Sequence, residues 1–393
     1  MNIPRKLIAL LLSALMLLPT RAQAVSGAPE YLTAEAAVPT VSLDISTSAG
    51  SAVLLDASGS AVRTLWEQNA DQRRGPASTT KIMTALVAAE QMPLSAKITV
   101  PREAVGVEGS SVYLTEGEVF TLEELLCCTL LESANDAAVA VAIAVGGSID
   151  EFSALMNEKC SELGLVDTHF TNPHGLDDEG HYTTARELGI IAAAALENEA
   201  LRKIFSTYKM TVSAPDGGVR TLVNHNRLLR SIDGCIGVKT GYTKSNGRCL
   251  VSAAERDGLR LIAVTLDDGN DWHDHTMMLE AGFNAYERIE LCKYTNVSLP
   301  EINVEGGEQS RVKTEATREV YVTLPKSGAE IKCSITSLPT LTAPVSRGQE
   351  VGEITFTCGG QEISRIPIVT AYAAAKKKEI GRASCRERVC LSV

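Results

Sequence analysis

The order of strand-like and helix-like patterns is the feature that most constrains the fold of this chain. Two strand patterns, Ser51–Asp56 and 62–67, come before a block of helical patterns that runs from Ser78 to about Ser206. Three more strand patterns and a helical pattern follow, at residues 235–240, 249–254, 259–266 and 276–288. Strands on both sides of a helical block favour a sheet assembled from distant segments. We therefore predict an α+β domain over residues 46–290.

The pattern changes after about Leu291. Short stretches there alternate or are rich in β-branched residues, separated by Gly, Pro and Asn, at residues 296–304, 318–324, 331–335, 350–358 and 363–369. Such spacing is typical of a small all-β domain, which we place at residues 291–370. A chain of 393 residues also suits two domains better than one.

Charge and metal-ligand spacing limit the partners. The formal net charge is −11, and an acidic chain repels phosphate backbones, so we expect no nucleic-acid partner. The histidines and cysteines show no metal-ligand spacing, so we expect no metal and no other cofactor. His273 and His275 flank Asp274 in what we interpret as a polar surface loop. Cys235 and Cys249 lie on neighbouring predicted strands, where they could form a disulfide or remain reduced.

The first 24 residues have the layout of a secretory signal peptide. Arg5 and Lys6 precede an apolar run at residues 7–18, and residues 22–24 are the small-residue cleavage motif Ala-Gln-Ala. The alternative is an uncleaved anchor, although the apolar run is short for a membrane span. We expect a secreted, extracytoplasmic protein in which residues 25–45 form an extended lead-in.

A Ser-x-x-Lys motif is the first candidate for chemistry. The motif alone carries little weight, because it occurs three times, at residues 78–81, 206–209 and 310–313. Only Ser78 stands before a run that is apolar on nearly every face, which predicts a buried helix. Lys81 would lie beside Ser78, one turn along, with a pKa lowered by burial and by the helix dipole. Lys81 could then take the proton of Ser78. The alternative is a Ser78 that only caps the helix and a Lys81 that extends to solvent.

Two further motifs follow along the chain. Ser-Ala-Asn at residues 133–135 falls between a helix that starts at a capping box, residues 121–124, and the apolar run 137–145. Lys-Thr-Gly at residues 239–241 ends a strand pattern, where the glycine lets a ligand approach the strand edge. Each motif has a structural alternative, an interhelical turn for the first and a hairpin end for the second.

The order of the three motifs is the signature of the serine penicillin-binding enzymes and β-lactamases. Together with Asn-Pro-His-Gly-Leu-Asp at residues 172–177, they resemble the low-molecular-mass D-alanyl-D-alanine carboxypeptidases, peptidase family S11. The resemblance implies a β-lactamase/transpeptidase-like domain, an antiparallel sheet flanked by helices, followed by the family's small C-terminal β-domain. It also implies two classes of ligand, peptidoglycan stem peptides ending in D-Ala-D-Ala and β-lactam antibiotics.

The resemblance further implies roles for individual residues. Ser78 would be acylated, Lys81 would be its general base, and Ser133 would relay a proton to the leaving amine. The backbone amides of Ser78 and Tyr242 would form the oxyanion hole. Substrate-binding roles are implied for Asn135, Lys239, Thr240 and Gly241. The loop at 172–177 has a structural alternative, since a glycine and a proline that shape a loop need no catalytic role.

Two departures from the family pattern bear on this prediction. Some members have arginines near the carboxylate site, but His225 and residues 270–272 occupy the comparable stretches here, so we assign no such arginine. A class A β-lactamase would need a catalytic glutamate in this region, and the only glutamate within residues 169–182, Glu179, lacks the Leu-Asn that usually follows. A non-catalytic penicillin-binding sensor is the other alternative, against which the intact motifs argue.

The C-terminal end has two parts. Residues 371–378 begin a basic, helix-forming stretch, which in this family commonly leads into an amphipathic helix on the membrane surface. Residues 379–393 lack the apolar periodicity of such a helix and contain two isolated cysteines. We interpret them as read-through of a sequencing adapter that replaces the native anchor. The alternative is a short basic tail.

Overall fold

The computed structural model describes residues 40–59, 61–213, 218–328 and 330–378. The signal peptide expected at 1–24 and the segment 379–393 lie outside these residues. Within them, no single helix is long and apolar enough to cross a membrane. Two successive helices, Asn135–Gly146 and Ile149–Glu162, meet the criteria of length and composition only as a pair bent by 81°.

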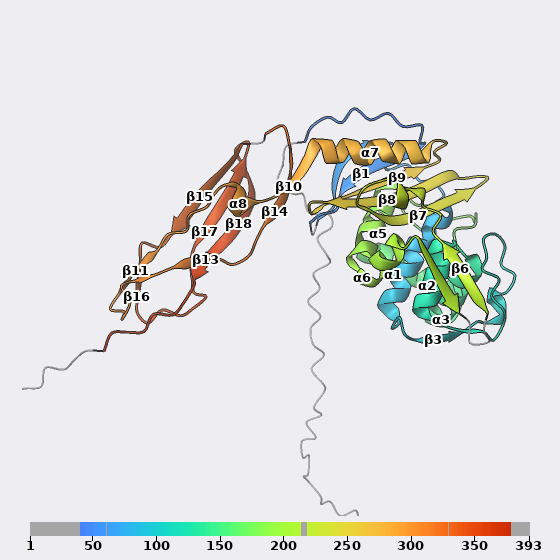
Figure 1. Cartoon of the computed structure of the whole chain (residues 1–393), viewed down its shortest axis with the longest axis horizontal. Coiled ribbons are helices and arrows are strands. Elements are labelled where there is room, and N and C mark those ends of the chain that lie inside the picture. The colour runs from blue at the N-terminus through green and yellow to red at the C-terminus, as the bar shows by residue number, and fades with distance from the viewer. Residues whose placement is uncertain (1–39, 60, 214–217, 329, 379–393) are drawn as a thin grey trace, which may run out of the picture.

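A five-stranded antiparallel sheet is the centre of the larger domain, as predicted (Figure 1). Its order is β2-β1-β9-β8-β7, so β1 lies beside β9, a strand that follows some 200 residues later. The strands are β1 (Ser51–Asp56), β2 (Arg63–Gln68), β7 (Cys235–Thr243), β8 (Gly247–Arg256) and β9 (Leu259–Leu266). β7 is an edge strand, and this position leaves one side of it open to a ligand.

Helices cover both faces of this sheet, because alternate strand residues point to opposite sides. In β1, Val53 and Leu55 join the core beneath α5 (Ala185–Glu197), whereas Leu54 joins the core beneath α7 (Asp271–Ala285). Figure 1 shows α7 on one side of the sheet and the other helices of this domain on the opposite side. Those helices include α1 (Lys81–Gln91), α2 (Leu122–Leu131), α3 (Asn135–Gly146), α4 (Ile149–Glu162) and α6 (Glu199–Ser206).

Two predictions about the region of His273 were wrong, the bounds of the helix and the polar surface loop. Helix α7 begins at Asp271 and ends at Ala285, several residues before the predicted helix at both ends. The supposed polar loop is thus the first turn of a helix. His275 is fully buried there, with Nδ1 2.5 Å from Ser252 Oγ and Nε2 3.0 Å from Thr265 Oγ1. The two hydroxyl groups satisfy the ring nitrogens of the buried histidine. The spacing of residues in the sequence alone could not identify them as its partners.

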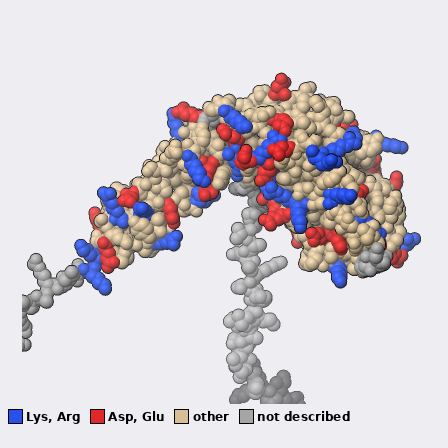
Figure 2. Space-filling model, in the orientation of Figure 1, with Lys and Arg blue, Asp and Glu red and all other residues tan. Residues whose placement is uncertain are grey.

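The chain leaves the first sheet through β10 (Tyr286–Glu290), which pairs with β14 (Tyr321–Pro325). The C-terminal β-region then packs around its own apolar cluster, which includes Ile354, Phe356 and Ile366. It contains a short helix, α8 (Leu291–Tyr294), and the strands β11 (Ile302–Glu305), β12 (Arg311–Val312), β13 (Thr314–Ala316), β15 (Ile331–Ser337), β16 (Thr340–Thr342), β17 (Glu350–Cys358) and β18 (Gln361–Thr370). Acidic and basic side chains are interspersed over the face drawn in Figure 2.

Residues 371–378, where we expected a helix to begin, are extended instead. Ala374 forms a bridge with Val345, and Lys376 forms one with Gly307. These pairings satisfy backbone groups that a helix would otherwise satisfy internally. Cys235 and Cys249, the possible disulfide, are both free thiols. Cys235 pairs in register with Ala254, whereas Cys249 pairs with Gly241, so the two cysteines lie far apart along the hairpin.

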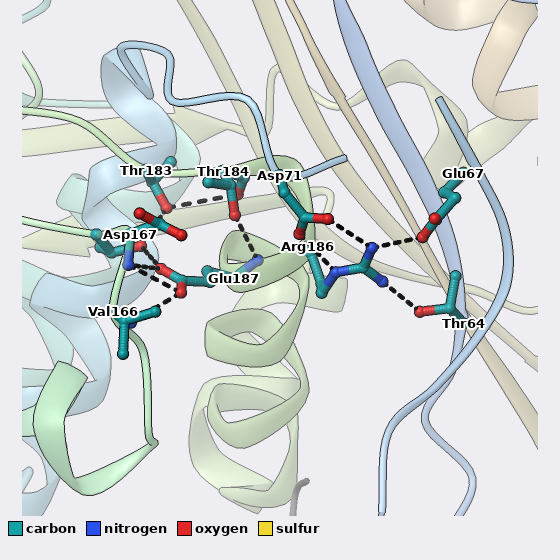
Figure 3. A network of polar contacts seen from close by, with 10 residues as sticks. Thr64, Glu67, Asp71, Val166, Asp167, Thr183, Thr184, Arg186 and Glu187 are labelled. Carbon is teal, nitrogen blue, oxygen red and sulfur yellow. Dashed lines mark hydrogen bonds and ion pairs between the residues drawn. The ribbon is translucent and has the colours of Figure 1, made fainter. Parts of the chain in front are cut away.

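A polar network fixes the N-terminal end of α5 to the segment before Ser78 (Figure 3). Arg186 donates to Asp71 and to Thr64, at 2.7 Å in each case, and pairs with Glu67 at 2.5 Å. Its neighbour Glu187 accepts hydrogen bonds from the backbone amides of Val166 and Asp167. The network therefore holds the residue 64–71 segment and the 166–168 loop against the same helix end.

Candidate active site

Ser78 lies in a tight turn rather than in the first turn of an α-helix. Residues 77–80 form a 3-10 turn, and α1 begins only at Lys81. Ala77 adopts the left-handed conformation, with φ of 49°, which an alanine rarely does. Strained backbone of this kind is stable only where the surrounding structure fixes it, and it is frequent at functional sites.

Lys81 is completely buried and makes three polar contacts. Its Nζ lies 2.9 Å from Ser78 Oγ, 2.7 Å from Asn135 Oδ1 and 2.6 Å from the carbonyl oxygen of His174. Burial lowers the pKa of Lys81 well below its ordinary value, and the neighbouring Lys239 lowers it further. A neutral amine has two N–H donors and one lone pair. If the two carbonyl oxygens take the donors, the lone pair is directed at the Ser78 hydroxyl.

The Ser-Ala-Asn motif lies at the break between α2 and α3, as predicted, and α2 begins with the predicted capping box. Ser133 has φ of 59° and faces the same hollow as Ser78. The amide of Asn135 is engaged at both ends, because Nδ2 donates to the carbonyl of Glu108 at 2.5 Å while Oδ1 accepts from Lys81. In this structure Asn135 therefore orients the lysine, a contact not foreseen from the sequence.

The Lys-Thr-Gly motif lies within β7, which continues to Thr243, so the motif does not end the strand as predicted. Lys239 is buried, and its Nζ donates to the carbonyl of Thr240 at 3.0 Å. Burial lowers the pKa of Lys239 to about 7, an effect that the carboxylate of Glu132 opposes. Gly241 passes against the serine turn so closely that a Cβ there would lie 3.0 Å from the Ser78 nitrogen. Only a glycine fits comfortably at this contact.

Comparison with known proteins identifies this arrangement. The family model described as D-alanyl-D-alanine carboxypeptidase matches residues 35–270, and that of the penicillin-binding protein 5 C-terminal domain matches residues 289–376. The chain belongs to the D-alanyl-D-alanine carboxypeptidase family. It is a serine D-Ala-D-Ala carboxypeptidase of the penicillin-binding type, the function that we predicted from the three motifs.

Individual relatives resemble this carboxypeptidase along most of its length. It is 34% identical over 331 residues to the D-alanyl-D-alanine carboxypeptidase DacF of Bacillus subtilis, covering 81% of this chain and 84% of that protein. DacC of Escherichia coli is 33% identical, with 87% of each chain covered. The crystal structure of penicillin binding protein 5 from Haemophilus influenzae superimposes with a TM-score of 0.66 at 28% identity, covering 86% of this chain and all of that one.

The hollow in front of Ser78 contains cations that the sequence analysis missed. It has a volume of about 350 Å³ and is lined by Ser78, Ser110, Ser133, His225, Arg227, Thr240, Gly241, Tyr242, Arg248, Asp271 and Trp272. Our decision to assign no arginine to this carboxypeptidase's cleft was therefore wrong. The two guanidinium groups, of Arg227 and Arg248, each lie 5.7 Å from the Trp272 ring centre. Arg248 also pairs with Asp271 at 2.8 Å.

A signal for Arg248 was present in the sequence. Because β7 and β8 form a tight antiparallel hairpin, Arg248 pairs in register with Tyr242, directly after the Lys-Thr-Gly motif. A hairpin register drawn from the turn would have placed Arg248 at the site. Arg227 follows a short loop and carried no comparable signal in the sequence.

Proposed function

We propose that this carboxypeptidase removes the terminal D-alanine from peptidoglycan stem peptides by way of an acyl-enzyme on Ser78. The observation that carries the proposal is the 2.9 Å contact between Lys81 Nζ and Ser78 Oγ at a fully buried lysine. Neutral Lys81 takes the hydroxyl proton while Oγ attacks the carbonyl of the penultimate D-alanine. The backbone amides of Ser78 and Tyr242 donate to the oxygen of the resulting tetrahedral intermediate.

Collapse of that intermediate breaks the C–N bond. Ser133, which faces the same hollow as Ser78, relays a proton to the departing amine. Water then attacks the ester on Ser78 and regenerates the hydroxyl, with Lys81 again moving the proton. A β-lactam enters the same route, but its amide bond is part of a ring, so the leaving nitrogen stays attached to the acyl group. The ester therefore persists.

The terminal carboxylate of the substrate binds at the β7 side of the hollow. Lys239 lies in β7 with Thr240 and Gly241, and Arg227 and Arg248 are two cations that line the hollow. A carboxylate brought there restores the charged form of Lys239, because an opposite charge favours the ammonium. Recognition of a free C-terminus thus follows from the cations rather than from the shape of the site alone.

We also infer the working location of this enzyme. The family acts on the cell wall, outside the cytoplasm, and the signal-peptide layout of residues 1–24 supports export. We assign catalysis to residues 46–290 and a separate β-domain to residues 291–370. The three lysines at 376–378 support attachment of the C-terminal side to an anionic membrane surface through an anchor beyond them.

Turnover of diacetyl-L-lysyl-D-alanyl-D-alanine tests the proposed activity. We expect stoichiometric, continuing release of D-alanine by the wild-type protein, together with long-lived inhibition by one equivalent of benzylpenicillin. The Ser78→Ala variant should release none, because it lacks the hydroxyl that Lys81 Nζ contacts. Rapid hydrolysis of penicillin with no release of D-alanine would instead indicate a β-lactamase, and binding without turnover of either ligand would indicate a sensor.

A further inference from the structure

A single exposed carboxylate joins two loops that lie beside the active site. Asp177 ends the loop 172–177, and it accepts hydrogen bonds from the turn between β7 and β8. Thr243 Oγ1 donates to it at 2.9 Å and Asn246 Nδ2 at 2.6 Å, and Ser245 Oγ donates to its second oxygen. Three donors from one turn converge on this side chain.

The loop 172–177 contacts both the base and the serine turn. The carbonyl of His174 accepts from Lys81 Nζ at 2.6 Å. Asn172 fixes the bend, since its Oδ1 accepts from the Gly175 amide at 2.7 Å. Gly175 has φ of 87°, and a Cβ there would lie 1.9 Å from the carbonyl oxygen of Ala77. The loop is therefore packed directly on the backbone that presents Ser78.

The β7–β8 turn is equally close to the catalytic backbone. Thr243 directly follows Tyr242, whose backbone amide we place in the oxyanion hole. Asn246 donates its backbone N–H to Thr243 Oγ1 at 3.1 Å. The Asn246 side chain also packs on Gly75, where a Cβ would lie 2.1 Å from Oδ1. The turn thus touches the start of the serine segment as well as the end of the oxyanion strand.

We propose that Asp177 is a positioning residue that fixes the base-holding loop relative to the oxyanion strand. The inference rests on the proposed roles of Lys81 and of the Tyr242 amide. Asp177 contacts no reacting atom in this scheme. It keeps Lys81 Nζ, through His174, at a constant separation from the donor on β7, and catalysis is sensitive to errors of about 1 Å in such spacing.

Replacing Asp177 by alanine tests this role. We expect kcat for D-alanine release to fall about tenfold, with KM changed by less than about a factor of two. Asp177 is exposed, and exposed polar pairs contribute little to stability, so the midpoint of thermal unfolding should hardly move. Asp167→Asn is the control, because the partly exposed Asp167 carboxylate forms an ion pair with Arg73, at 2.7 Å, and does not contact the β7–β8 turn in the described residues. Its kcat should equal that of the wild type.

The decisive readout compares an ester substrate with its thionoester. Sulfur is larger and accepts hydrogen bonds poorly, so a well-fixed oxyanion hole discriminates strongly against it. The ratio of kcat/KM values, ester over thionoester, should fall severalfold in Asp177→Ala and stay at the wild-type value in Asp167→Asn. Asp177→Asn gives the same comparison should the alanine variant fold poorly. The exchange of Asp177 and Asn246, as D177N with N246D, should restore part of the ratio.

An unchanged ratio in a folded Asp177 variant would overturn the positioning role. The failure of the proposed function looks different, because the wild-type protein would then release no D-alanine from diacetyl-L-lysyl-D-alanyl-D-alanine. A wild type that releases D-alanine, together with an unchanged ratio, refutes only the role of Asp177.

Discussion

Replacing Lys81 by alanine should slow acylation by benzylpenicillin about 10²–10⁴-fold, the usual loss when a general base is removed. The reason is geometric, because Lys81 Nζ is 2.9 Å from Ser78 Oγ and two carbonyl oxygens take its other contacts. Without the amine, the Ser78 hydroxyl keeps its contact with the His174 carbonyl oxygen, at 3.4 Å, but a carbonyl oxygen is too weak a base to take its proton. Stopped-flow measurement of the acylation rate checks this expectation.

Lys209→Ala is the matched control for this experiment. Lys209 belongs to a second Ser-x-x-Lys motif, at residues 206–209, but it is exposed on β5 (Lys209–Ser213). Its removal should leave the acylation rate unchanged. A Lys81→Ala protein that acylates at the wild-type rate would show that another group is the base.

Replacing Lys239 by alanine should lower kcat/KM for a peptide with a free C-terminal carboxylate by roughly tenfold to 150-fold. That range corresponds to about 1.5–3 kcal/mol for a hydrogen bond to a charged group. The same substitution should have a much smaller effect on the C-terminally amidated peptide, which offers no negative charge. The comparison of the two substrates in one variant isolates recognition of the carboxylate from any general damage.

The pH dependence of the wild-type enzyme provides a second check on Lys239. Burial lowers the pKa of Lys239 to about 7 in the free enzyme, and the charged form is the one that attracts a carboxylate. The kcat/KM for the free-acid peptide should therefore contain a component that is lost as pH rises through about 7. Lys239→Ala should abolish this component. A component of the same size in the variant would assign it to another group, such as His225 at the same hollow.

Much of the fold could be predicted from local pattern. The bounds predicted for β1 and β9 match the structure, because a buried central strand is a continuous apolar run with polar turns at both ends. Helix α7 was misplaced because four of its first five residues are aspartate or histidine. Such polar residues are typical of a surface loop. The burial of His275 against the sheet depends on tertiary packing, which the local sequence does not show.

The active site likewise contains contacts that local sequence predicts and contacts that it does not. The Ser-x-x-Lys motif placed Ser78 and Lys81 together, since residues three apart lie on the same side of a 3-10 turn as well as of an α-helix. The contact of His174 with Lys81 depends on a loop more than 90 residues away. The position of Arg227 in the lining of the hollow also depends on how distant segments pack together. Contacts between distant segments depend on tertiary packing, which a single sequence does not reveal.

Peptide mapping of the penicillin adduct would identify the nucleophilic serine of this carboxypeptidase. The wild-type protein is treated with benzylpenicillin, denatured and digested, and the modified serine is identified by tandem mass spectrometry. We predict one adduct per chain, on Ser78, and none on Ser206 or Ser310, which begin the other two Ser-x-x-Lys motifs. An adduct on any other serine would contradict the assignment of Ser78 as the nucleophile.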